Sequence, residues 1–131
     1  MRQDEFVDAT YVTVTVRNLA DPELAWEGEF LVDTGALHSA VPRRHLDAIG
    51  IQPEDTRKLE MADGTDVTFD VGFARLYFMD EQAPVTVLFG DDDAEPVLGR
   101  IAMMSAALRF DPVSQSFERI RRFLVHRRPV D

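Results

Sequence analysis

Alternation of apolar and polar residues at every second position is the feature that most constrains the fold of this chain. Residues 10–17 alternate valine with threonine, and a second alternating run spans residues 67–78. A period of two places successive side chains on opposite faces of an extended strand, so both runs predict half-buried β-strands. Further extended segments are predicted at residues 26–32, 84–89, 108–110 and 116–120. The chain is therefore expected to be rich in β-structure.

Two short helices are predicted between these strands. Residues 43–49 follow Pro42, which suits the first turn of a helix, and precede Gly50, which can take the left-handed conformation that ends one. Residues 100–107 are rich in Ala and Met, and these residues favour helix. We find no repeat, low-complexity tract or linker that divides the chain.

A β-hairpin is predicted around Asp63-Gly64. This dipeptide lies between the extended segments 59–62 and 65–69. Asp-Gly favours tight turns that need a positive φ, so the two segments are expected to fold back on each other. An ordinary surface hairpin is the simplest interpretation of this pattern.

Composition excludes several classes of protein. The 131 residues include 14 Lys or Arg and 24 Asp or Glu, a net charge of −10, and no Cys. This length suits one compact domain. The absence of cysteine excludes disulfides and thiolate metal sites, and the negative charge disfavours nucleic acid as a partner. No apolar run is long enough to cross a bilayer and no secretory leader is visible, so we expect a cytoplasmic protein.

The charge is unevenly distributed along the chain. Residues 1–118 contain 9 basic and 23 acidic side chains, whereas residues 119–131 contain five arginines and one acid. We therefore expect a domain over residues 1–118 and a basic C-terminal tail over 119–131. Ile120, Phe123 and Leu124 recur at helical spacing in this tail. A membrane surface, an acidic partner or the acidic body of this chain would suit such a helix, but membrane contact is not favoured over a solvated terminus.

One short sequence carries the clearest chemical signal. The apolar residues 30–32 lead directly into Asp33-Thr34-Gly35-Ala36. A carboxylate placed directly after a buried strand is costly to desolvate unless it is hydrogen-bonded or used in chemistry. The glycine permits a sharp turn, and the threonine hydroxyl can brace it. A capping or turn aspartate in an ordinary β-protein is the alternative interpretation of Asp33.

This sequence resembles the active-site signature of retropepsin-like (retroviral-type) aspartic proteases. Residues 62–64 lie about where that family has its β-hairpin flap. Residues 97–100, Val-Leu-Gly-Arg, resemble the apolar-apolar-Gly segment that passes beside the catalytic turn before a short helix. Residues 108–118 resemble the terminal strand with its Asp-Pro turn. The resemblance implies an all-β, retropepsin-like single-domain acid protease fold with two short helices, a closed, barrel-like sheet and a flap hairpin.

The resemblance also implies a homodimer, because the chain has a single Asp-Thr-Gly. Aspartic protease chemistry uses two carboxylates about 3 Å apart that share one proton. A twofold dimer would bring together Asp33 of each subunit, supported by Gly35 and by Thr34 gripping the loop of the partner. The expected activity is that of an aspartic-type endopeptidase, favoured from acid to near-neutral pH.

A polypeptide substrate is expected to bind in extended form in a cleft beneath the flap. The resemblance implies that Ala36, Leu37 and His38 line the floor of this cleft. The flap would consist of Met61, Ala62, Asp63, Gly64 and Thr65. Viral members carry acidic residues directly after Asp-Thr-Gly-Ala, where this chain has leucine and histidine. No metal or organic cofactor is implied.

Other interpretations of the same residues remain open. The fold could serve as a catalytically inactive peptide-binding or dimerisation module. The acidic loop at residues 90–95 lacks the ligand spacing of a calcium site, so a solvated loop is favoured. His38, His45 and His126 show no metal-ligand spacing, although His38 lies beside the expected cleft. Nothing places Ser39 on a nucleophile elbow, so a serine-type triad is disfavoured.

Overall fold

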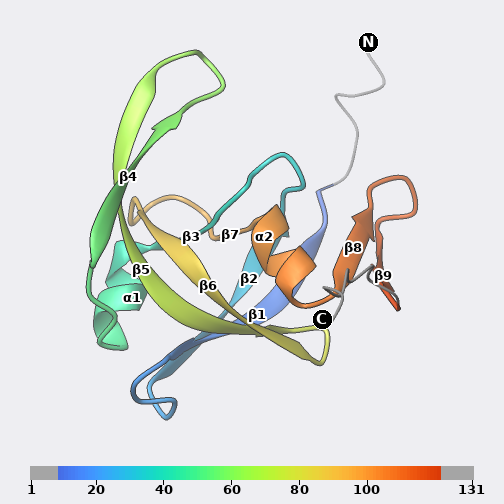
Figure 1. Cartoon of the computed structure of the whole chain (residues 1–131), viewed down its shortest axis with the longest axis horizontal. Helices are drawn as coiled ribbons and strands as arrows, with labels where there is room; N and C mark the ends of the chain where they lie inside the picture. Colours follow the sequence, from blue (N-terminus) through green and yellow to red (C-terminus); the bar gives the residue numbers. More distant parts are fainter. Residues whose placement is uncertain (1–8, 122–131) are drawn as a thin grey trace, which may run out of the picture.

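The computed structural model describes residues 9–121 and shows a β-rich fold with two short helices, as the sequence predicts (Figure 1). Within this range, neither helix has the length and apolar character needed to cross a bilayer. The elements in chain order are β1 (Tyr11–Asn18), β2 (Ala25–Val32), β3 (Ser39–Pro42), α1 (Arg43–Ala48), β4 (Asp55–Glu60), β5 (Asp66–Phe78), β6 (Glu81–Gly90), β7 (Val97–Leu98), α2 (Arg100–Ser105), β8 (Leu108–Asp111) and β9 (Ser116–Arg119).

Seven of the strands form one sheet in the order β1-β2-β7-β3-β6-β5-β4. Strand β1 also pairs with β5, so six strands close into a ring and β4 lies outside it. The ring is not evenly closed, because β3 and β7 are joined through a single residue pair, Ala40 with Val97. The predicted barrel-like sheet is therefore confirmed as an unevenly closed ring.

The core fills the inside of this ring, and the alternation of the sequence explains why. In β1 the side chains of Val14 and Val16 are fully buried, whereas the intervening Thr15 is half-buried. Phe30 from β2, Leu76 from β5 and the two valines belong to the same core cluster. Burying apolar side chains of this size stabilises a fold by roughly 1.5–3 kcal/mol each.

The β4–β5 hairpin extends beyond the ring (Figure 1, green). Residues 66–70 of β5 pair only with β4, and pairing with β6 begins at Val71. The connecting residues 61–65 are closed by hydrogen bonds from the Met61 N–H to the Thr65 carbonyl (2.7 Å) and from the Gly64 N–H to the Met61 carbonyl (2.9 Å). Gly64 has a φ of +88°, which confirms the predicted hairpin and the need for glycine at its turn.

Several local predictions differ from the structure. The first strand of the hairpin, predicted at residues 59–62, is β4 at Asp55–Glu60, and residues 61–62 belong to the turn. Strand β6 begins at Glu81 rather than at residue 84, because Met79 and Asp80 alone form the turn from β5, with φ of 53° and 61°. Neither residue is the glycine or asparagine that usually marks such a turn. Helix α2 ends at Ser105, two residues early. Pro42 is the N-cap residue of α1 rather than part of its first turn, because β3 leads directly into the helix.

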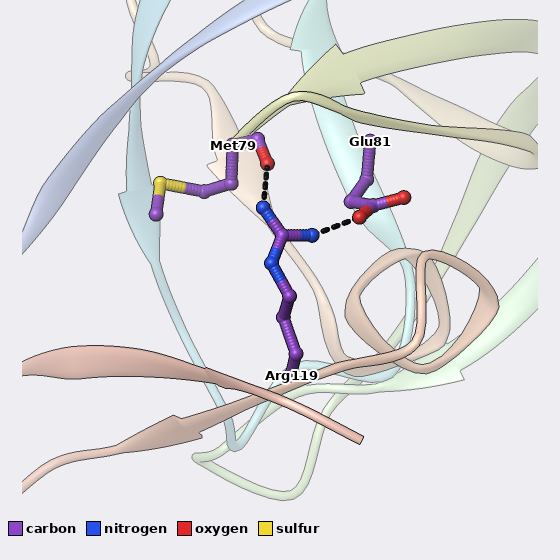
Figure 2. Close-up of polar contacts among 3 residues, drawn as sticks. All are labelled: Met79, Glu81 and Arg119. Atoms are coloured by element: carbon purple, nitrogen blue, oxygen red, sulfur yellow. Dashed lines mark hydrogen bonds and ion pairs between the residues drawn. The ribbon is translucent and has the colours of Figure 1, made fainter. Parts of the chain in front are cut away.

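Strands β8 and β9 form a separate two-stranded sheet. Arg119 at the end of β9 forms an ion pair with Glu81 and donates a hydrogen bond to the Met79 carbonyl (3.4 Å), as Figure 2 shows. The Ile120 N–H also donates to the Ala107 carbonyl (2.8 Å). The contacts of Arg119 attach the small sheet to the β5–β6 turn, whereas the Ile120 bond continues the β8–β9 pairing. The helix predicted from Phe123 and Leu124 lies outside the described residues.

Candidate active site

Asp33 lies at the end of β2, in a turn that its own side chain stabilises. The Asp33 N–H donates to the Leu98 carbonyl (3.1 Å), and the Asp33 carbonyl accepts from the Ala36 N–H (3.2 Å). Its Oδ1 accepts the Gly35 N–H at 2.9 Å. The side chain is half-buried, and within residues 9–121 no hydrogen bond engages its second oxygen, Oδ2. The carboxylate is thus oriented through one oxygen while the other stays available.

The segment from β7 into α2 holds this turn in place, as the resemblance of residues 97–100 implies. The Arg100 N–H donates to the Ala36 carbonyl (2.8 Å), and the Ile101 N–H donates to the Leu37 carbonyl (3.1 Å). The Arg100 guanidinium contacts the Thr34 carbonyl at 3.4 Å. Three backbone carbonyls of the Asp33 turn are therefore held by two successive residues of one element.

Gly99 permits this close approach of two backbone segments. A Cβ atom at this position would lie 2.5 Å from both the carbonyl carbon and the carbonyl oxygen of His38, and 2.9 Å from the Leu37 oxygen. Real Cβ atoms do not approach backbone atoms so closely. Only glycine fits between β7 and α2 while the Asp33 turn stays where it is.

Ser39 has a structural role that the sequence did not reveal. Its side chain is buried, and its Oγ accepts the Gly99 N–H at 2.9 Å. This bond satisfies a backbone donor that would otherwise be buried without a partner. The two residues are 60 positions apart in the chain, and no local sequence pattern connects them.

A groove of about 370 Å³ lies between the Asp33 turn and the β4–β5 hairpin. Six of the residues predicted for the site line it: Asp33, Gly35, Ala36, Leu37, His38 and Met61. Its lining also includes six residues that the sequence analysis did not assign: Ala40, Leu59, Glu60, Phe69, Leu88 and Val97. Five of these six are apolar, so the groove combines the carboxylates of Asp33 and Glu60 with an apolar surface. The alternation of apolar and polar residues along the hairpin could have identified Leu59 and Phe69 as lining residues.

The remaining predicted residues do not line this groove. Thr34 is exposed and lines a separate groove beside α2 and β8. Ala62, Asp63, Gly64 and Thr65 are exposed at the tip of the hairpin. There the Asp63 carboxylate accepts hydrogen bonds from the backbone N–H (3.0 Å) and hydroxyl (2.6 Å) of Thr65. These bonds lower the pKa of Asp63, so the tip keeps its negative charge at neutral pH.

The imidazole of His38 lies half-buried on the lining of the groove. Burial lowers its pKa below the ordinary value of 6.5, and the positive charge of Arg57 on β4 lowers it further. His38 is therefore neutral at pH 7. The unfolded chain binds a proton on His38 more readily than the folded chain does. The contribution of His38 to the free energy of unfolding therefore falls in acid and rises with pH up to about 6.5.

Replacing Arg57 with glutamine is expected to raise the pKa of His38 toward 6.5, because it removes the second of these two causes. His45 is a control, since the pKa of that residue is lowered by burial and by Arg44 instead. Titration of the histidine ring carbons by NMR measures both values. A His38 midpoint that does not move in Arg57→Gln would contradict this assignment.

His45 and the acidic loop are engaged elsewhere, and His126 lies outside the described residues. His45 stacks on Trp26 with ring centroids 3.9 Å apart. Asp92 accepts the Arg44 N–H at 2.8 Å through its carboxylate, which places the acidic loop against the first turn of α1. Within the described range, no three His, Asp or Glu side chains are grouped closely enough to hold a metal ion.

Comparison with known proteins adds one match to this geometry. A family model described as Aspartyl protease matches residues 12–101. The matched segment runs from β1 into α2 and so contains the Asp33 turn, the β4–β5 hairpin and Gly99. No curated protein matches the chain.

Proposed function

Because the chain belongs to the aspartyl protease family, we propose that it is an aspartic endopeptidase in which two Asp33 carboxylates meet across a homodimer. Family membership supports a protease function in general. The observation that carries the finer proposal is the position of Asp33, which has one available carboxylate oxygen and lines the groove between its own turn and the β4–β5 hairpin.

The chemistry requires a second carboxylate. Two carboxylates about 3 Å apart cannot both ionise, so they share one proton. The ionised member takes a proton from a water, whose oxygen then attacks the carbonyl carbon of the scissile peptide bond. The protonated member gives its proton to the carbonyl oxygen, which forms a tetrahedral gem-diol. In the second step one carboxylate takes a proton from a hydroxyl of the gem-diol, the other carboxyl gives its proton to the amide nitrogen, and the C–N bond breaks. The single Asp-Thr-Gly of this chain supplies one carboxylate per copy, and a twofold axis beside Asp33 would supply the other.

The groove suits an extended polypeptide. Its apolar lining would receive apolar side chains on either side of the scissile bond. The hairpin places Leu59, Met61 and Phe69 opposite the Asp33 turn, where closure would exclude water from the reacting atoms. Gly64 at the exposed hairpin tip has a left-handed conformation, and a Cβ atom at this position would meet no atom within 4 Å.

A second candidate is a catalytically inactive peptide-binding or dimerisation module on the same fold. It is favoured by Leu37 and His38, which stand where viral members of the retropepsin-like group have acids that hold the substrate backbone. Such a module would keep the groove and the dimer without hydrolysis.

Incubation with a peptide library, read by mass spectrometry between pH 4 and pH 7, separates the two candidates. Products formed by the parent chain and absent with Asp33→Asn support the endopeptidase. Equal products from both proteins would place any cleavage outside this site. Binding of peptides by both, with no products from either, favours the inactive module.

A further inference from the structure

We propose that His38 and Arg57 form a subsite for an acidic side chain of the substrate, at the margin of the groove between the Asp33 turn and the β4–β5 hairpin. The inference rests on the proposed function and deepens it, since it names a class of polypeptide that the groove selects. His38 lines the groove just after the Asp33 turn, and Arg57 comes from β4 of the hairpin. Each can donate a hydrogen bond to a carboxylate.

The register of the hairpin places the Arg57 side chain on the face that lines the groove. Arg57 is paired with Phe69 across the two strands, and side chains of directly paired residues lie on the same face of a sheet. Leu59, two residues after Arg57 on β4, shares that face because side chains alternate along a strand. Both Phe69 and Leu59 line the groove, so Arg57 continues the same face at its margin.

Neither His38 nor Arg57 is engaged by an acid of the described chain. Within residues 9–121, Arg57 forms no ion pair and the imidazole of His38 forms no hydrogen bond. The neighbouring cation Lys58, by contrast, pairs with Asp66 at 3.5 Å. Asp55 shares the face of Arg57 without forming an ion pair with it. The positive charge of Arg57 is close enough to His38 to lower its pKa, so one carboxylate can be held by both groups.

The remaining charges restrict where an acidic side chain can bind. The carboxylates that line the groove are those of Asp33 and Glu60, and both repel a second acid. Glu60 follows Arg57 by three residues, about 10 Å along the strand. The net charge of −10 also disfavours acidic peptides over the rest of the surface. A preference for an acidic substrate therefore cannot come from the chain as a whole and requires the local charge of Arg57.

Peptide binding to Asp33→Asn tests the inference without cleavage. The probes are fluorescein-labelled peptides of leucine, alanine and serine with glutamate at one scanned position, together with the same peptides carrying glutamine or lysine there. At the preferred position, the glutamate peptide is expected to bind about three- to tenfold more tightly than the glutamine peptide, because it gains one charge pair in a groove open to water. The lysine peptide should bind most weakly. Fluorescence anisotropy measures the three dissociation constants.

Substitutions of Arg57 in the same background assign the preference to this residue. Arg57→Gln should remove the preference for glutamate, and Arg57→Glu should reverse it in favour of lysine, which the loss of a merely structural arginine would not do. Lys58→Gln is the matched control, because it removes the same charge from the next residue, whose side chain lies on the opposite face of β4. Lys58→Gln should keep the preference for glutamate.

The pKa of His38 gives an independent readout of the bound carboxylate. Saturation of Asp33→Asn with the glutamate peptide is expected to raise this pKa above its value with the glutamine peptide, because a nearby negative charge favours the protonated ring. Titration of the histidine ring carbons by NMR measures the shift, with His45, stacked on Trp26, as the internal control. Equal His38 midpoints with the two peptides would overturn the inference.

The outcomes separate this inference from the catalytic proposal. Cleavage by the parent chain with no preference for glutamate, or with a preference that Arg57→Gln keeps, overturns the inference and leaves the Asp33 mechanism intact. A preference in binding that depends on Arg57, in a protein whose parent chain cleaves no peptide, supports the inference and contradicts only the catalytic proposal. Failure of every glutamate peptide to bind Asp33→Asn overturns the inference.

Discussion

Asp33→Asn is expected to reduce the peptidase kcat by at least about a thousandfold. The asparagine side chain can neither take a proton from water nor give one to the peptide carbonyl, and general acid–base catalysis contributes about 10²–10⁴-fold. Because both copies carry the substitution, the pair loses its shared proton as well. Steady-state cleavage of a fluorogenic peptide measures the loss.

The same substitution is expected to leave the fold intact. The hydrogen bond that Asp33 makes within the turn is accepted by Oδ1, and the amide oxygen of asparagine can accept the same Gly35 N–H. The urea midpoint of Asp33→Asn should therefore stay close to that of the parent chain. Retained activity in a folded Asp33→Asn protein would exclude Asp33 as the catalytic carboxylate.

Gly99→Ala is expected to destabilise the protein by about 3 kcal/mol or more, because the new methyl group would overlap the backbone of His38. Unlike a crowded side chain, the His38 carbonyl cannot move away without shifting the backbone between the Asp33 turn and β3. The hydrogen bonds from Arg100 and Ile101 to the Asp33 turn would lengthen, so peptidase activity should fall together with stability. Urea unfolding and peptide cleavage measure the two losses.

Gly90→Ala is the matched control for this substitution. A Cβ at Gly90 would lie 3.5 Å from the Val41 carbonyl oxygen, an ordinary contact distance. Because glycine loses more backbone freedom on folding than alanine does, this change at the last residue of β6 is expected to be neutral or to stabilise the protein by about 0.5 kcal/mol. Equal stability of Gly99→Ala and Gly90→Ala would contradict the claim that the backbones of Gly99 and His38 are too close for a Cβ atom.

The sequence predicted those parts of the fold whose signal is local. Period-two alternation located β1 and β5, and Asp63-Gly64 located the turn of the hairpin. Strand β3 went unrecognised because four residues are too few to show a period. The β5–β6 turn was missed because it contains neither glycine nor asparagine, and Met79 adopts a positive φ that is uncommon for its residue type.

In the candidate site, too, the local features were predictable from the sequence and the contacts between distant segments were not. Asp33 and its neighbours follow each other in the chain, so their sequence alone predicted one turn at the end of a strand. The contacts of Ser39 with Gly99, and the shared groove of Phe69 and Val97, depend on how β3, β5 and β7 meet in the ring. Pairings between such distant segments follow from strand order, which short sequence patterns do not encode.

Mixed dimers offer the most direct test of whether activity needs two copies of Asp33. Parent chain and Asp33→Asn are combined in equal amounts, unfolded together in urea and refolded, so that subunits associate at random. Ultracentrifugation of each protein alone establishes that both dimerise equally. If each active centre needs both carboxylates, roughly one quarter of the activity of an all-parent sample should remain, because only that fraction of dimers has two. A remaining activity of about one half would show that each Asp33 acts independently, and about three quarters would show that one Asp33 per dimer suffices; either result would contradict the account.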